Sequence, residues 1–177
     1  MNNNFKKDLE YSVLGREEPF WQDAYKQAFP GMIFAQLAED NCQGQQFGID
    51  RVIQLSSGKT LYIDEKKRRR GDCGDILLEY KSNGNGSRNN GWMNKQLLID
   101  YIAYAFMPDK RVYLLDWESL KRAWVRMGKT WFNLAKSKQE GFNIISAKNE
   151  TYTTFSVAVP TKVLFEEMLK PIIVNIK

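Results

Sequence analysis

Two carboxylates and a lysine stand at spacings that suit metal chemistry in residues 48–70, whose sequence is GIDRVIQLSSGKTLYIDEKKRRR. Side chains two residues apart in a β-strand point to the same face, so Asp64 and Lys66 would lie side by side. A hairpin turn at residues 56–59 would bring Asp50 close to Asp64. Neighbouring carboxylates repel each other, and a divalent cation between them would offset that repulsion. The segment therefore predicts a metal site on a β-hairpin.

Such a group could assist the hydrolysis of a phosphodiester bond. The metal ion would activate water and stabilise developing negative charge, while Lys66 would hold a water molecule or a transition-state oxygen. The chain contains no histidine, which excludes Ser-His-Asp triads, Cys-His dyads, histidine-ligated metals and HNH-type nuclease sites. Cys42 and Cys73 are the only cysteines, too few for the usual zinc sites. Carboxylate and water ligands instead suit Mg²⁺ or Mn²⁺.

Apolar periodicity indicates the elements that must position these residues. It predicts a helix at residues 17–29, strands at 48–55, 60–67 and 75–81, a helix at 92–106 and a strand at 111–115. Residues 32–39 fit either a short helix or a strand. Farther along, the sequence predicts a helix at 117–127, strands at 142–147 and 152–159, and a helix at 160–169. This order of helices and strands is typical of an α/β fold with a mixed central sheet flanked by helices.

The order of Asp50, a hairpin, apolar residues and Asp64-x-Lys66 resembles the active-site motif of the PD-(D/E)XK nuclease superfamily. The spacing and the basic residues that follow are most similar to its Holliday-junction-resolvase branch and to related phage nucleases. In that superfamily a restriction-endonuclease-like core of helix, three strands, helix and strand carries the site. The resemblance covers about residues 17–115 and leaves about residues 116–177 as an α/β extension within a single domain, 1–177.

The resemblance implies a role for each residue of the motif. Asp50 and Asp64 would bind Mg²⁺ or Mn²⁺, and Lys66 would orient the attacking water. The superfamily often adds an acidic residue from the first helix, which implies Glu18 as a further metal ligand, with Glu17 and Asp23 as the other candidates there. The implied function is a divalent-metal-dependent nuclease that hydrolyses DNA and is encoded by a phage or another mobile element.

Two other arrangements of the site stay open at this point. Position 65 is usually apolar in the superfamily, and here Glu65-x-Lys67 offers a second register on the opposite face of the strand. The third predicted strand carries Glu79-x-Lys81, which would occupy the superfamily's second acidic position with Asp64 as its partner. We favour Asp50, Asp64 and Lys66 as the core, with Glu79 as a supplementary ligand from a neighbouring strand. The non-functional alternative is that these residues are surface charges at strand ends.

Basic residues follow the predicted site directly. The chain has a net charge of +5, which favours a polyanionic partner. The residues that we expect to contact nucleic-acid phosphates are Lys67, Arg68, Arg69 and Arg70, together with Arg88 in the polar loop at 82–91.

The remaining predictions concern location and the main rival function. No apolar run approaches the ~18–20 residues that span a bilayer, and the N-terminus is polar, so we expect a cytoplasmic protein with no membrane partner. The sequence leaves the oligomeric state open. The rival to a nuclease is a non-catalytic nucleic-acid-binding protein on the same fold.

Overall fold

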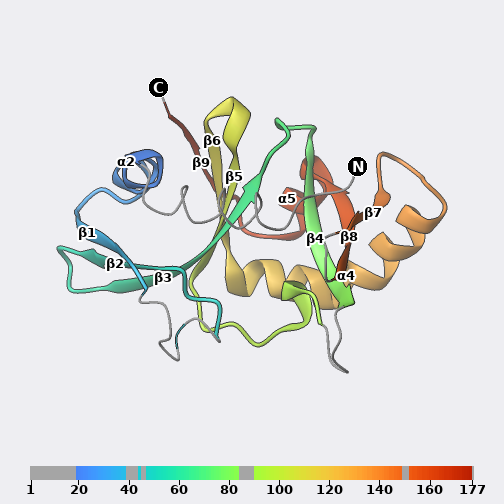
Figure 1. Cartoon of the computed structure of the whole chain (residues 1–177), viewed down its shortest axis with the longest axis horizontal. Coiled ribbons are helices and arrows are strands. Elements are labelled where there is room, and N and C mark those ends of the chain that lie inside the picture. Colours follow the sequence, from blue (N-terminus) through green and yellow to red (C-terminus); the bar gives the residue numbers. More distant parts are fainter. Residues whose placement is uncertain (1–18, 39–43, 45–46, 84–89, 149–151, 177) are drawn as a thin grey trace. The chain divides into compact units, whose positions relative to one another are not determined.

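A computed structural model describes residues 19–38, 44, 47–83, 90–148 and 152–176 (Figure 1). The fold is mixed α/β, as the sequence predicts. The described residues form two compact units that alternate along the chain. We call the first the six-stranded unit; it lies within Ser12–Cys73, Gln96–Ser119 and Leu169–Lys177. The three-stranded unit includes Gly74–Lys95 and Leu120–Met168.

The six-stranded unit contains one mixed sheet. Its strands, in spatial order, are β1 (Met32–Leu37), β2 (Arg51–Leu55), β3 (Thr60–Arg68), β5 (Tyr101–Phe106), β6 (Arg111–Asp116) and β9 (Ile172–Asn175). Neighbours pair antiparallel except β3 and β5, which run parallel. The β2–β3 hairpin closes as predicted at residues 56–59, where Gly58 adopts φ +85° in open space. That positive φ suits glycine because it has no Cβ.

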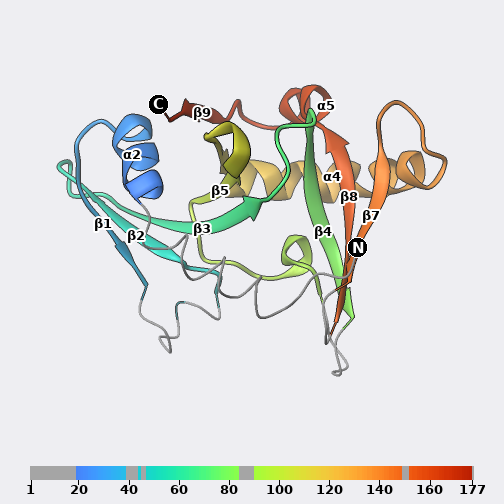
Figure 2. The same cartoon turned by 45° about the horizontal axis from the view of Figure 1, so that its top comes forward.

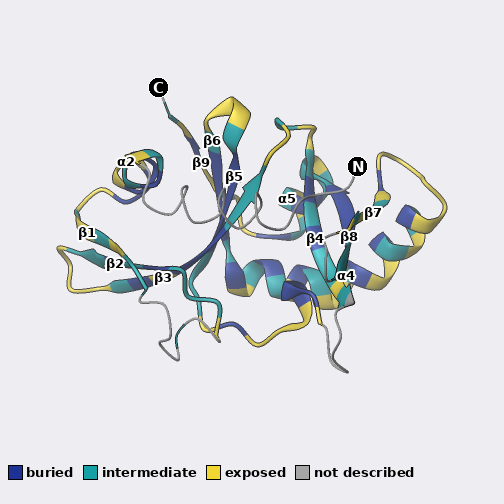
Figure 3. Ribbon diagram, in the orientation of Figure 1, coloured by how far each residue is buried: buried dark blue, intermediate teal, exposed yellow. Residues whose placement is uncertain are grey.

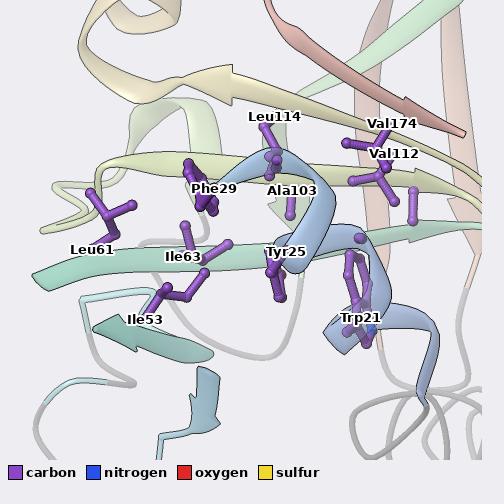
Figure 4. Close-up of a cluster of buried hydrophobic side chains, with 13 residues drawn as sticks. Trp21, Tyr25, Phe29, Ile53, Leu61, Ile63, Ala103, Val112, Leu114 and Val174 are labelled. Carbon is purple, nitrogen blue, oxygen red and sulfur yellow. The ribbon is translucent and has the colours of Figure 1, made fainter. Parts of the chain in front are cut away.

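Helix α2 (Pro19–Ala28) confirms the predicted first helix over the described residues and supplies one side of this unit's core. Trp21 and Tyr25 are fully buried, and Phe29 follows just after the helix, so that the spacing places aromatic rings along one face. They pack with apolar side chains of the sheet, among them Ile53 of β2 and Ile63 of β3 (Figure 4). One face of the β2–β3 hairpin is therefore committed to the core.

The three-stranded unit contains an antiparallel sheet in the order β4 (Asp75–Asn83), β8 (Thr153–Pro160) and β7 (Asn143–Lys148) (Figure 2). Helix α4 (Trp117–Lys136) belongs to it from Leu120 onward, and α5 (Thr161–Glu167) follows β8. The 3-10 turn η1 (Trp92–Asn94) packs against β4. The predicted elements of the C-terminal third are thus confirmed in type.

The predicted helix at 92–106 is wrong. Only η1 is helical there, while 101–106 form strand β5; a second 3-10 turn, η2 (Met107–Asp109), follows that strand. Five consecutive residues from Ile102 to Phe106 are buried, so both faces of β5 are covered. A strand covered on both faces reads as a continuous apolar run, which periodicity cannot tell from a buried helix.

The placement of the third predicted strand is also wrong. Residues 75–83 do form a strand, β4, but it pairs with β8 in the second sheet, and the neighbours of β3 are β2 and β5. Strand β9 was not predicted at all. Among the described residues, no helix is long and apolar enough to cross a membrane.

Candidate active site

The pairing of β2 with β3 brings Asp50 beside Asp64. In the hairpin register Arg51 lies opposite Ile63, and the Asp50 amide donates a hydrogen bond of 2.9 Å to the carbonyl oxygen of Ile63. Asp50 itself stands one residue before β2 begins and is half-buried. The predicted proximity of positions 50 and 64 is therefore what the backbone produces.

A second backbone group holds the Asp50 side chain. The amide of Glu65 donates a hydrogen bond of 2.9 Å to Oδ2 of Asp50. This bond crosses from β3 to the residue that precedes β2, so it fixes the Asp50 carboxylate against the strand that carries Asp64 and Lys66. A charge-assisted bond of this kind is stronger than one between neutral groups.

Asp64 and Lys66 lie side by side on β3, as the two-residue period predicts. The Lys66 ammonium forms an ion pair with Oδ1 of Asp64. The Asp64 side chain is 4% exposed and the Lys66 side chain is 30% exposed. The buried carboxylate is therefore paired with a side chain that solvent reaches. Asp50, Asp64 and Lys66 together form what we call the acidic site.

The electrostatics of the acidic site leave negative charge poorly compensated. Burial raises the pKa of Asp64 to about 7; Lys66 acts in the opposite direction, and the nearby Asp50 carboxylate raises it further. The interaction with Lys66 therefore does not offset the burial of Asp64 beside a second carboxylate. A further positive charge beside Asp50 and Asp64 would lower that cost.

The opposite face of β3 carries a different arrangement. Glu65 points into the core, where its Oε1 accepts a hydrogen bond of 2.5 Å from Nε of Arg51 and one of 2.8 Å from the Tyr25 hydroxyl. Arg51 is 3% exposed and Glu65 9% exposed. A metal ion held by Glu65 would thus have to enter the packed core, where Glu65 already bonds to Arg51 and Tyr25. The Asp64 register stays a prediction.

Arg51 and Tyr25 are the residues that sequence reasoning missed. Both act on Glu65, whose backbone amide in turn holds Asp50. An arginine directly after Asp50 in a strand was the available signal, since charge at an inward-facing strand position calls for a buried partner.

Glu79 does not lie on a strand next to Asp64. It belongs to β4 of the second sheet, where a bulge lies between Glu79 and Lys81. The expectation that Asp64, Glu79 and Lys81 stand on adjacent strands is wrong because β5, from a distant part of the chain, takes the position beside β3. A supplementary metal-binding role for Glu79 stays a prediction.

The predicted phosphate-contacting residues follow β3 out of the sheet. Lys67 and Arg68 end the strand half-buried, and Arg69 and Arg70 are exposed. The guanidinium carbon of Arg68 lies 5.8 Å from the ring centroid of Phe106, a cation–π contact. Glu18 and Arg88 lie outside the described residues.

The loop that follows the basic residues is held at Asp72. Its Oδ2 accepts a hydrogen bond of 2.9 Å from Arg111 and one of 2.5 Å from the Tyr113 hydroxyl, while its amide donates to the Asp109 carboxylate. These bonds tie the end of the loop to β6 and to the turn before it, which limits how far Arg69 and Arg70 can move.

The donor set is compatible with Mg²⁺ or Mn²⁺. Among the described residues there is no group of three or more His, Cys, Asp or Glu side chains that could hold a metal ion. Mg²⁺ does not need one, because it commonly binds through one or two carboxylates and completes its octahedron with water and substrate phosphate oxygens. Asp50 and Asp64 supply the required pair.

No protein-family model, no curated protein and no solved structure matches the chain significantly.

Proposed function

We propose that this protein is a divalent-metal-dependent nuclease that hydrolyses phosphodiester bonds in DNA. The observation that carries the proposal is the meeting of Asp50 and Asp64 with Lys66 on one face of the β2–β3 hairpin. The restriction-endonuclease-like core implied by the sequence motif belongs to the proposal too. It is supported by helix α2 and the meander β1–β2–β3, with β5 added parallel to β3. The second helix of that core has no counterpart between β3 and β5 among the described residues.

Asp50 and Asp64 would hold Mg²⁺ or Mn²⁺, and the bound ion would lower the pKa of a water molecule and stabilise charge on the phosphate. The protein's own contribution is positional. The Glu65 amide fixes the Asp50 carboxylate, and the buried position of Asp64 limits its motion. A rigid ligand pair costs little reorganisation when substrate arrives.

Lys66 would orient the attacking water and stabilise the phosphorane-like transition state. Its ammonium is paired with Asp64 in the structure. When that carboxylate binds a cation, the same ammonium can donate hydrogen bonds to a water molecule or a phosphate oxygen nearby. Lys67 and Arg68–Arg70, at the end of the same strand, would contact the backbone phosphates that flank the scissile bond.

A cleavage assay tests this function. Branched, single-stranded and double-stranded DNA are incubated with the full chain in Mg²⁺, in Mn²⁺ and in EDTA. We expect cleavage of at least one substrate with either metal and none in EDTA. An RNA strand of the same sequence tests whether the sugar matters.

The rival function is a non-catalytic nucleic-acid-binding protein. It would use the same basic residues but would not require a metal ion at the acidic site. It predicts binding without cleavage of every substrate, and binding that is indifferent to Asp64→Asn. Isothermal titration with Mn²⁺ separates the two directly, because only the nuclease hypothesis predicts metal binding that Asp64→Asn removes.

A further inference from the structure

The excess positive charge of the protein is concentrated in helix α4 and the two residues after it. Residues 117–138 contain six basic residues and one acidic residue, Glu118, while the whole chain has a net charge of +5. Basic and acidic residues therefore balance over the rest of the chain. The six basic residues are Lys121, Arg122, Arg126, Lys129, Lys136 and Lys138.

Four of these residues line one side of the helix. At 3.6 residues per turn, Arg122, Arg126, Lys129 and Lys136 fall within an arc of about 80°, and they extend over about 21 Å of helix axis. All four are exposed (Figure 3). We call them the basic stripe. The opposite side of α4 is apolar and buried, through Leu120, Ala123, Trp131 and Ala135.

The stripe is unfavourable for the helix alone. Glu118 stands four positions before Arg122, but no Asp or Glu stands three or four positions from Arg126 or Lys129. Arg122 and Arg126 are like charges four apart, Arg126 and Lys129 are like charges three apart, and each such pair destabilises the helix. A polyanionic partner would turn this repulsion into attraction.

Local contacts hold part of the stripe in place. Arg126 donates hydrogen bonds from Nη2 to Oε2 of Glu167 at 2.5 Å and to the Glu167 carbonyl at 2.9 Å. The Lys136 ammonium lies 4.7 Å from the Phe132 ring centroid. These contacts restrict the side chains, so less conformational entropy is lost when they bind phosphates.

The chemistry of the stripe fits a nucleic-acid backbone better than a membrane surface. A membrane-bound amphipathic helix inserts its apolar side into lipid, whereas the apolar side of α4 is already buried within the three-stranded unit. About 21 Å corresponds to about six phosphates of one strand at 3.4 Å per nucleotide. The stripe therefore extends over about the length of six phosphates of one strand, and its cations other than the Glu167-paired Arg126 can face that row of anions.

We propose that the basic stripe of α4 binds the phosphodiester backbone of nucleic acid. This inference rests on the proposed nuclease function and gives the three-stranded unit a role in it. The unit would hold a stretch of substrate backbone through charge alone and leave cleavage to the acidic site.

The test uses Arg122→Gln/Lys129→Gln, which spares the ion pair of Arg126. The matched control is Lys148→Gln/Lys162→Gln, which removes the same charge from exposed positions in the same unit. Binding of a short mixed-sequence DNA duplex is measured in EDTA at several salt concentrations. We expect the stripe variant to bind about tenfold more weakly, with the salt slope reduced by about two, and the control to bind as the wild type does.

Three further measurements separate the possible outcomes. Circular dichroism verifies that the stripe variant is folded, and Arg122→Lys/Lys129→Arg should restore wild-type affinity because it keeps the charges. If the stripe variant and the control bind DNA equally, the stripe proposal is overturned while the nuclease proposal stands. If the wild-type protein binds no nucleic acid, both are overturned. Loss of binding to phosphatidylserine vesicles, with DNA binding unchanged, would make the stripe a membrane contact instead.

Discussion

Asp64 and Glu65 are consecutive buried carboxylates on β3, and their side chains contact different charged groups. Glu65 is matched inside the protein by a permanently charged guanidinium and a phenol. Asp64 has one lysine and faces a second carboxylate, Asp50. Burial raises the pKa of both carboxylates, and Oε2 of Glu65 has no hydrogen-bond partner among the described residues. The difference is that Glu65 pairs with a buried guanidinium, whereas Asp64 pairs with a lysine beside a second carboxylate. Burial is common to both carboxylates, so the charged groups around each one are what distinguish them.

The two faces are also linked. The side chain of Glu65 is fixed by the core, and its backbone amide donates to Asp50 on the acidic site. Glu65 thus helps to position one carboxylate of the acidic site. Variants that change one face of β3 and leave the other intact test whether the two faces have different roles.

The largest effect is expected from Asp64→Asn. The amide lacks the charge that holds the cation, so cleavage should fall below detection, while DNA binding persists or tightens because a repulsive charge is gone. Cleavage and filter binding on the same duplex measure the two effects. The control is Glu166→Gln, an exposed change of the same kind on α5 that should leave both unchanged. Wild-type cleavage by the Asp64→Asn protein would remove Asp64 from the metal site.

Arg51→Met addresses the opposite face. It leaves Glu65 buried without its cation, which should lower the free energy of unfolding by about 3–5 kcal/mol. Denaturant titration measures this loss. Arg126→Met removes a more exposed ion pair with Glu167 and should cost about 1 kcal/mol or less. Arg51→Met/Glu65→Leu should recover most of the loss, since neither charge is then buried. Equal costs for the two single variants would contradict the internal role assigned to Arg51.

Lys66→Ala should lower kcat about 10²–10³-fold, the usual cost of losing one stabiliser of a transition state. Metal binding should change much less, because both carboxylates remain. Single-turnover cleavage gives the rate, and Mn²⁺ titration gives the affinity. Lys59→Ala, an exposed change in the hairpin turn, is the control. A similar rate for both variants would leave Lys66 with a structural role only.

A smaller effect is expected in the dependence of stability on pH. The pKa of Asp64 is raised to about 7 in the folded protein, against about 3.9 when unfolded. The folded state then holds more protons between these values, so the contribution of Asp64 to stability is present at low pH and declines as the pH rises from about 4 to 7. We expect a decline on the order of 1–3 kcal/mol relative to Asp64→Asn.

Thermal or urea unfolding in EDTA at several pH values measures this difference. Added Mg²⁺ should reduce the decline, because the cation stabilises the ionised carboxylate. Parallel pH curves for the wild-type protein and Asp64→Asn in EDTA would show that Asp64 does not titrate in this range.

The sequence pattern predicts most of the helices and strands correctly, but it does not predict which strands pair. The hairpin of β2 and β3 follows from two apolar strands and a short polar turn, and the helices α2 and α4 follow from their periodicity and flanking residues. The sequence pattern predicts a helix where strand β5 forms, because both faces of the strand are buried. The partner of β4 could not be read from the sequence, since β8 lies more than seventy residues later.

The sequence by itself determined which chemistry is available and which side chains share a strand face. A chain without histidine must use carboxylates and lysines, and the two-residue period of a strand sets Asp64 and Lys66 together and Glu65 apart. The tertiary structure decided what each face meets. Helix α2 and Arg51 cover Glu65, and β5 occupies the place beside β3 that β4 was expected to take. Those choices depend on contacts between distant segments, whose burial energies no local pattern records.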